Sequence, residues 1–132
     1  MPVTDELEID ALLSRYCRAV DSQDWASYRA LFTDDAWVDY SAAGLVVGTV
    51  DEAVSYLGRH QQSISVGMHY VTNIESTLDD DGAGASVIAM WFSAAALPGT
   101  GEIGFFAGRW QDDLVRTAAG WRIRTLTLEV AS

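Results

Sequence analysis

The sequence predicts an α+β domain in which three N-terminal helices pack on a curved, mostly antiparallel sheet. Helical patterns fill most of the first 60 residues, and four long strand-like segments follow them. The segments that join these strands are short and rich in Asp, Gly and Pro, residues that form turns. Short connections favour an antiparallel meander, because parallel neighbours need a long crossover connection.

The first helix has the clearest pattern in the chain. Its apolar residues recur at intervals of three and four positions, which places them on one face of an amphipathic helix. They are Ile9, Leu12, Leu13, Tyr16, Cys17 and Val20. Asp21 would lie on the same apolar face if the helix continues, an unusual place for a carboxylate. It could instead end this helix or cap the next one.

A short second helix, a small hairpin and a third helix follow. The second helix is predicted from Trp25, Tyr28, Leu31 and Phe32. The polar segment 33–35 ends it, and a strand over residues 37–40 then pairs with residues 46–47. Thr49 and Glu52 form a capping box for the third helix. The apolar positions of that helix are Val50, Ala53, Val54 and Leu57.

Four long strands are predicted over residues 65–78, 83–94, 102–115 and 120–130. Side chains alternate between the faces of a strand, so His69, Val71 and Asn73 should share one face. Both faces of the later strands carry large apolar side chains. The helices can cover only one face, and a second subunit is the simplest cover for the other. We therefore expect a homo-oligomer, either a dimer or a trimer.

Composition narrows the possible partners. The length of 132 residues predicts a single domain over residues 1–132, and the hydrophobic fraction of 49% is typical of a globular protein. The net charge of −11 argues against nucleic-acid and membrane partners. The chain has one cysteine, Cys17, and no apolar stretch of about 20 residues, so we expect a cytoplasmic protein without disulfides. It has neither a metal-ligand cluster nor a Gly-rich dinucleotide turn, so we expect no metal and no cofactor.

Asp21 and His69 are the candidate catalytic pair. A carboxylate that orients an imidazole is the minimum equipment for proton transfer near neutral pH. In this interpretation His69 is the base, and Asp21 fixes its tautomer and stabilises the imidazolium. The alternative for His69 is a core histidine bound to a backbone carbonyl.

Five segments together resemble one known family. They are residues 16–21, 30–36, 69–73, 108–110 and 120–123, in an order typical of the SnoaL-like branch of the nuclear transport factor 2-like (NTF2-like) superfamily. The resemblance runs across nearly the whole chain. It implies a cone-like fold with a deep apolar cavity between sheet and helices. Members of this branch include scytalone dehydratase, hexachlorocyclohexane dehydrochlorinase and bile-acid 7α-dehydratase.

The resemblance also suggests roles for individual residues. In the eliminating members an Asp at the end of the first helix holds a His from the first long strand, and Asp21 and His69 match these positions. Tyr16 matches a tyrosine of the bile-acid dehydratase, whereas the dehydrochlorinase has a lysine there. Leu126 falls where the pattern has a late-strand arginine, and Arg124 is the nearest residue that could replace it.

We therefore predict a cofactor-independent lyase, a dehydratase acting on an apolar, carbonyl-bearing small molecule. Tyr16 would donate a hydrogen bond to the carbonyl or the departing hydroxyl, unless it is an ordinary core tyrosine. The residues expected to bind substrate are Val38, Tyr40, Met90, Phe92, Phe106, Trp110, Arg124 and Leu126. The alternatives are an isomerase or polyketide-type cyclase using the same dyad, and a non-catalytic small-molecule-binding module.

Overall fold

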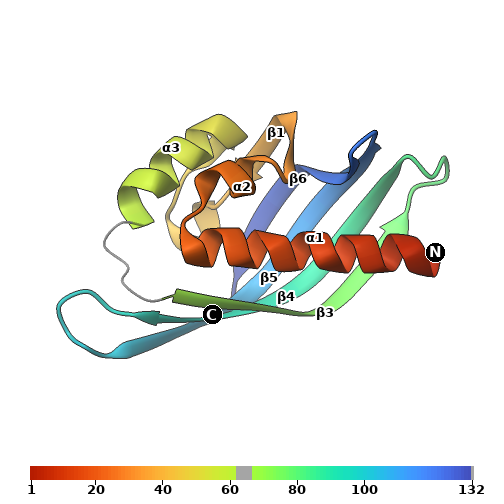
Figure 1. The fold of residues 1–132 in the computed structure, drawn as a ribbon. Coiled ribbons are helices and arrows are strands. Elements are labelled where there is room, and N and C mark those ends of the chain that lie inside the picture. The colour runs from red at the N-terminus through yellow and green to blue at the C-terminus, as the bar shows by residue number, and fades with distance from the viewer. Residues whose placement is uncertain (62–66, 132) are drawn as a thin grey trace.

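The computed structural model describes residues 1–61 and 67–131. Three α-helices, one short 3₁₀ helix and six strands lie in this part of the chain (Figure 1). Their order is α1 (Val3–Ser22), α2 (Trp25–Arg29), β1 (Phe32–Asp39), η1 (Ser41–Ala43), β2 (Val47–Thr49), α3 (Val50–His60), β3 (Gly67–Leu78), β4 (Gly84–Ala96), β5 (Ile103–Thr117) and β6 (Gly120–Val130). The predicted α+β class is confirmed. Residues 65–66, where we expected the first long strand to begin, lie outside the described residues.

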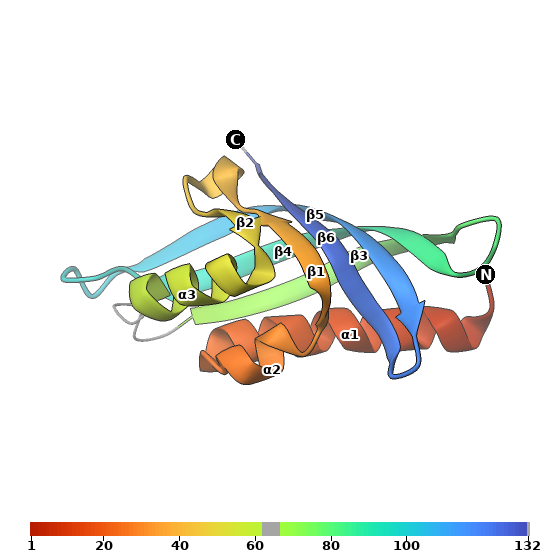
Figure 2. The same ribbon diagram turned by 90° about the horizontal axis from the view of Figure 1, so that it is seen from above.

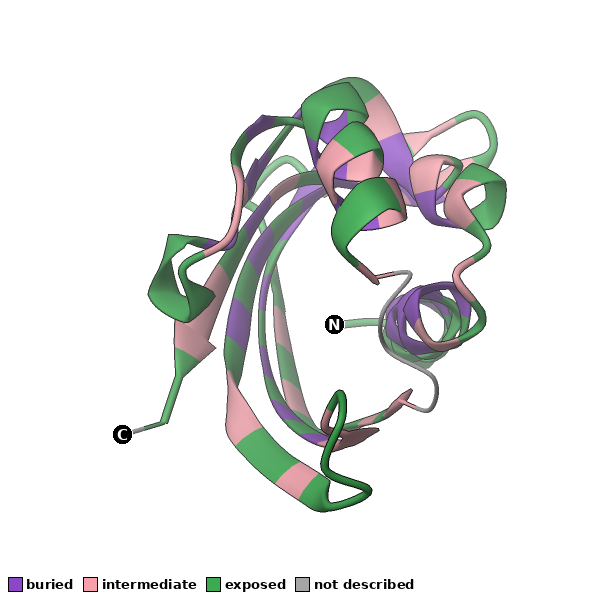
Figure 3. Ribbon diagram, turned by 90° about the vertical axis from the view of Figure 1, so that its left-hand side faces the viewer, coloured by how far each residue is buried: buried purple, intermediate pink, exposed green. Residues whose placement is uncertain are grey.

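The strands form one sheet in the order β2-β1-β6-β5-β4-β3. Strands β3 to β6 make an antiparallel meander, and β1 joins its last strand in parallel, side by side with β6 in Figure 2. Viewed along α1, the sheet curves so that the three α-helices lie on its concave side (Figure 3). None of the helices described is both long and apolar enough to span a membrane.

Helix α1 buries the predicted apolar face against the sheet. All six residues of the apolar pattern are buried, at most 9% exposed. The helix ends where Gln23 takes a left-handed conformation, with φ of 55°. The cap of α2 is Asp24, whose side chain accepts a hydrogen bond from the backbone N–H of Ser27. Asp21 therefore lies within α1 and is not the cap of the next helix.

Helix α2 is shorter than the sequence predicts, and β1 is longer. The helix ends at Arg29, and Phe32 already belongs to β1. Phe32 pairs with Ile123 of β6, whose backbone N–H donates to Leu31 at 2.9 Å. Pairing with a strand distant in the sequence thus overrides the local helical spacing. The capping box of α3 is confirmed, because the Thr49 hydroxyl accepts a hydrogen bond from the Glu52 N–H.

A β-bulge in β3 changes which residues share a face. Thr72 pairs with Met90 and Glu75 pairs with Ile88, so two residues of β3 stand opposite one residue of β4. Asn73, one of these two, has a positive φ of 51° and is exposed. The prediction that it shares a face with His69 and Val71 is wrong, because the bulge reverses the alternation at this point.

The convex face of the sheet carries several exposed apolar side chains. The largest lie on β1, β3, β4 and β5: Trp37, Met68, Tyr70, Ile88, Met90, Phe92 and Phe105. Their exposed fractions run from 41% for Phe92 to 67% for Phe105. The helices lie on the other side of the sheet and leave this face open.

Candidate active site

Asp21 and His69 meet where the end of α1 lies beside the start of β3. The His69 ring nitrogen Nδ1 is 2.6 Å from Asp21 Oδ1. The same carboxylate accepts the backbone N–H of His69, at 2.9 Å to Oδ2 and 3.1 Å to Oδ1. The sequence predicts this contact, and the structure places the two side chains together. A carboxylate acceptor at Nδ1 favours the tautomer with its proton there, which leaves Nε2 as the nitrogen able to accept a proton.

The dyad lies in the wall of a cavity of about 870 Å³ between the helices and the sheet. The size is in the range of sites that enclose a small organic molecule. Its lining is mostly apolar and aromatic, with polar groups concentrated near the end of α1. The lining residues that matter below are Tyr16, Asp21, Tyr40, His69, Trp91, Ser93, Phe106 and Trp110.

Three buried tyrosines form a hydrogen-bonded chain at one side of this cavity. The hydroxyl groups of Tyr16 and Tyr40 are 2.5 Å apart, and those of Tyr40 and Tyr28 are 2.8 Å apart. Tyr16 and Tyr40 line the cavity, whereas Tyr28 lies behind them. Burial raises the pKa of each phenol well above its ordinary value. All three therefore stay neutral near pH 7 and can donate hydrogen bonds.

Two stacked indoles form an aromatic wall. The Trp91 and Trp110 rings lie 6.2 Å apart between centroids and within 20° of parallel. Trp91 crosses over Gly108 of β5 and donates its indole N–H to the backbone oxygen of Glu129 at 3.2 Å. A Cβ at Gly108 would lie 2.9 Å from the Trp91 ring and closer still to that oxygen, so only glycine leaves room there.

The comparisons with known proteins agree with this architecture. The sequence profile of the SnoaL-like domain matches residues 1–127. The chain belongs to the SnoaL-like family. This places the domain in the NTF2-like superfamily, as the sequence resemblance predicts.

One relative and two solved structures are similar to this chain over most of its length. An uncharacterized protein of Mycobacterium tuberculosis is 34% identical over 92% of this chain and 82% of its own length. The crystal structure of a candidate aromatic ring hydroxylase from Novosphingobium aromaticivorans has a TM-score of 0.89 at 27% identity, covering 100% of this chain and 92% of that one. A candidate scytalone dehydratase from the same species has a TM-score of 0.88 at 18% identity, covering 98% and 86%.

This SnoaL-like domain places some of the predicted substrate-binding residues elsewhere. Tyr40, Phe106 and Trp110 line the cavity as expected. Met90 and Phe92 are 43% and 41% exposed on the convex face, so their assignment to the cavity is wrong. The alternation along β4 turns Trp91 and Ser93 inward instead.

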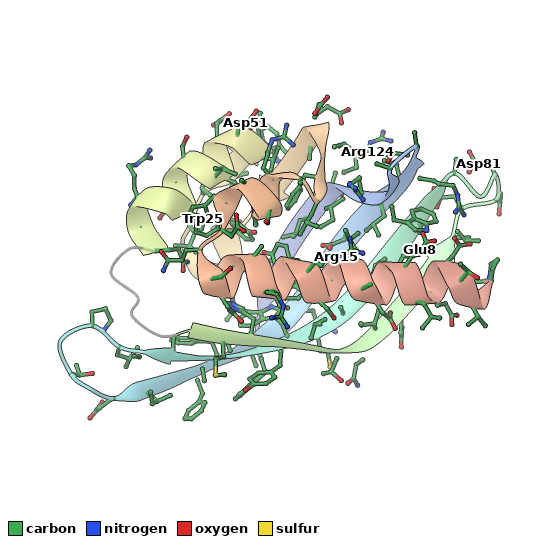
Figure 4. All side chains as sticks on the ribbon, in the orientation of Figure 1. Glu8, Arg15, Trp25, Asp51, Asp81 and Arg124 are labelled. Atoms are coloured by element: carbon green, nitrogen blue, oxygen red, sulfur yellow. The ribbon has the colours of Figure 1, made fainter. Side chains whose placement is uncertain are left out.

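The remaining predicted positions also lie outside the cavity of the SnoaL-like domain. Val38 and Leu126 pair across β1 and β6 and are fully buried in the core, where they do not reach the cavity. Arg124 is exposed near the β5–β6 turn, whereas α1 ends on the opposite side of the same view (Figure 4). It cannot replace the missing late-strand arginine, because its side chain does not line the cavity.

The sequence interpretation missed three lining residues on β4, of which Trp91 and Ser93 matter for the site and the third is Ala95. Alternation alone could not select them, because the opposite face of β4 carries the larger number of bulky apolar residues. The register with β3 is the signal that identifies them: His69 pairs with Ser93, and Trp91 is two positions away on the same face.

Charge is distributed unevenly around the cavity. None of the arginines lines it among the residues described, and Asp21 is its only carboxylate there.

Asp112 of β5 is buried in the core, and neither of its carboxylate oxygens has a hydrogen-bond partner in the part of the chain described. Burial and the neighbouring Asp113 raise its pKa well above the ordinary value. Cys17 is also buried, which raises the pKa of its thiol to about 12 and keeps it unreactive.

In residues 1–61 and 67–131, no group of three or more His, Cys, Asp and Glu side chains is arranged to hold a metal ion. The polar groups that reach the cavity are the dyad, two phenols, Ser93, Ser22 and two glutamines, Gln23 and Gln61. This set can move a proton and bind neutral oxygen atoms.

Proposed function

We propose that this SnoaL-like domain is a cofactor-independent lyase that removes water from a neutral small molecule bearing a carbonyl group. The observation that carries the proposal is the 2.6 Å contact between Asp21 and His69 in the wall of an apolar cavity. A base held in one tautomer in the wall of a mostly apolar cavity is suited to abstract a proton from carbon.

The reaction begins at His69. Its Nε2 takes the proton from the carbon next to the carbonyl, and the electron pair of that C–H bond moves toward the carbonyl oxygen. The imidazolium that forms is stabilised by the Asp21 carboxylate. The bond between the next carbon and its hydroxyl then breaks, a carbon–carbon double bond forms, and the hydroxyl takes a proton from His69 or Tyr16. The products are an unsaturated carbonyl compound and water. If Tyr16 is the donor, the His69 imidazolium returns a proton to Tyr16, and both residues are again in their starting state.

Tyr16 is the donor toward the developing negative charge. If Tyr28 donates to Tyr40 and Tyr40 donates to Tyr16, the Tyr16 proton remains free for the substrate oxygen. Neutral phenols can stabilise an enolate in this way. No arginine lines the described part of the cavity, so the chain of phenols stabilises the negative charge that a cation would otherwise stabilise.

The same arrangement supports an isomerase or cyclase as a second candidate. The observation in its favour is that His69 is the base of a cavity whose described lining carries no arginine. A single base of this kind can remove a proton from one carbon and return it to another. The two candidates differ in the mass of the product, because only the lyase releases water.

The test uses 3-hydroxy-1-tetralone, a neutral ring ketone that becomes 1-naphthol when it loses water. We expect the wild type to accelerate formation of 1-naphthol, measured by mass spectrometry and absorbance. His69→Ala should remove this acceleration, and His60→Ala, which changes the other histidine at the exposed end of α3, should keep it. Equal rates for wild type and His69→Ala would refute the proposal. Product of unchanged mass would favour the isomerase.

We also propose that the protein assembles as a homo-oligomer, a dimer or trimer, through the convex face of the sheet. The exposed apolar side chains on β3, β4 and β5 support this assembly, since contiguous apolar surface of this kind marks interaction sites.

A further inference from the structure

Ser93 stands directly beside the candidate base. In the register of β3 and β4, His69 pairs with Ser93, and on the other side Ser93 pairs with Phe106 of β5. All three side chains line the same cavity. Side chains directly opposite each other on one face of an antiparallel pair have Cβ atoms roughly 4.5–5.5 Å apart. The Ser93 hydroxyl is therefore within reach of a substrate atom that also touches the His69 ring.

The Ser93 hydroxyl has no hydrogen-bond partner among the described residues, although Ser93 is only 5% exposed. Ser86 of the same strand differs: it lies on the convex face, is exposed, and its hydroxyl contacts Asp113 Oδ1. When a ligand displaces water from a buried hydroxyl and gives it no new hydrogen bond, the bound state is destabilised. A ligand that fills the cavity must therefore supply an oxygen or nitrogen atom to Ser93, or bind less tightly.

We propose that Ser93 is a substrate-binding residue that selects neutral ring compounds carrying a hydroxyl or carbonyl oxygen. The hydroxyl group of Ser93 both donates and accepts, so it can bind either kind of oxygen. With Tyr16 and His69 it gives the cavity three polar contact points against the aromatic wall of Trp91 and Trp110. No arginine lines the described cavity, which disfavours carboxylate and phosphate groups.

The role of Ser93 in turnover rests on the proposed lyase function, but its role in binding does not. If Ser93 holds the oxygen that leaves or the carbonyl that is polarised, it fixes the reacting carbon next to His69 Nε2. If the protein only binds small molecules, Ser93 still discriminates between ligands with and without the oxygen.

The test compares 2-naphthol with naphthalene, two flat neutral ligands that differ by one hydroxyl group. Binding is measured by the fluorescence of the cavity tryptophans, Trp91 and Trp110. The informative variants are Ser93→Thr and Ser93→Val, which have nearly the same shape and differ only in the hydroxyl. We expect the preference of the wild type for 2-naphthol to be kept in Ser93→Thr and to fall about two- to tenfold in Ser93→Val.

Two controls make the result decisive. Ser86→Val changes the serine on the convex face of β4 and should leave the preference unchanged. Ser93→Ala removes the hydroxyl without adding bulk, and it should lose the preference as Ser93→Val does. Agreement between the two variants shows that the loss does not come from misfolding caused by the larger valine side chain. The same preference in Ser93→Val and Ser93→Ala as in the wild type would overturn the proposal. A wild type that binds neither ligand would overturn it too.

The outcome is separable from the test of the lyase. Loss of the 2-naphthol preference in a protein that does not dehydrate 3-hydroxy-1-tetralone would support the Ser93 inference and refute the proposed reaction. An unchanged preference in the Ser93 variants, together with turnover that depends on His69, would support the proposed reaction and refute the Ser93 inference.

Discussion

Asp21 holds His69 through two groups at once. Its carboxylate accepts a hydrogen bond from the imidazole Nδ1 at 2.6 Å and others from the backbone N–H of the same residue. The backbone bonds join the end of α1 to the start of β3, and the ring bond sets the tautomer. The carboxylate therefore fixes both where the histidine lies and which nitrogen faces the substrate.

Asp21→Asn should separate these two effects. Asparagine keeps an oxygen for the backbone N–H, but its NH₂ group next to Nδ1 favours the opposite tautomer and does not stabilise an imidazolium. We expect turnover to fall by roughly a thousandfold or more. The melting temperature should fall less than in Asp21→Ala, which loses every one of these hydrogen bonds. Activity close to that of the wild type in Asp21→Asn would contradict the proposed role.

Tyr16→Phe tests the chain of phenols. The substitution removes the hydroxyl that faces the cavity and leaves the bond between Tyr28 and Tyr40 in place. We expect turnover to fall on the order of ten- to a thousandfold, mainly in kcat, because the interaction strengthens in the transition state. Since burial raises the pKa of Tyr16, the wild-type rate should show no loss from phenol ionisation near neutral pH. An unchanged kcat in Tyr16→Phe would assign this residue to packing alone.

Asp112 should make the fold less stable as pH rises. Its pKa is raised in the folded protein, where burial keeps the carboxyl protonated. Below the ordinary value of 3.8 both the folded and the unfolded chain hold this proton, so no stability is lost. Above it the unfolded chain releases the proton, and the free energy of unfolding decreases until the pH reaches the raised pKa.

Asp112→Asn removes this dependence. Asparagine cannot ionise, so the melting temperature of the variant relative to the wild type should increase from pH 4 to pH 8, as measured by calorimetry. The change of this difference with pH is the informative quantity. Burial of the asparagine amide lowers the melting temperature of the variant by a similar amount at every pH. Asp10→Asn, at an exposed position of α1, is the control and should show a much smaller trend. A constant difference between wild type and Asp112→Asn would contradict the prediction.

The convex face predicts self-association. We expect sedimentation velocity at micromolar concentration to show a dimer or trimer. Assembly through this face would bury side chains such as Tyr70 and Phe92, which are exposed to water in the single chain. Phe92→Glu should shift the protein toward the monomer without changing the Asp21–His69 contact, which lies on the other face. Arg18→Glu, on an exposed position of α1, controls for the change of charge. A wild type that sediments as a monomer would count against this assembly.

The sequence by itself determined the class of fold, the buried face of α1 and the capping box of α3, and the family resemblance predicted that Asp21 and His69 would meet. These features depend on local spacing or on the family pattern, and both are present in the linear order of residues. The polar group at Asp21 was visible because it interrupts an otherwise apolar helix face.

Only the tertiary structure decided which face of β4 lines the cavity. Leu78 pairs with Ala85 beside the β3–β4 turn, and an unbroken register from there would place His69 opposite Ala94, on the face of Met90 and Phe92. The bulge at Asn73 adds one residue to β3, so His69 stands opposite Ser93 instead. A shift of one residue exchanges the two faces of a strand, because side chains alternate with a period of two. When both faces are apolar, the pattern of residues cannot reveal that shift, and packing against the helices fixes it.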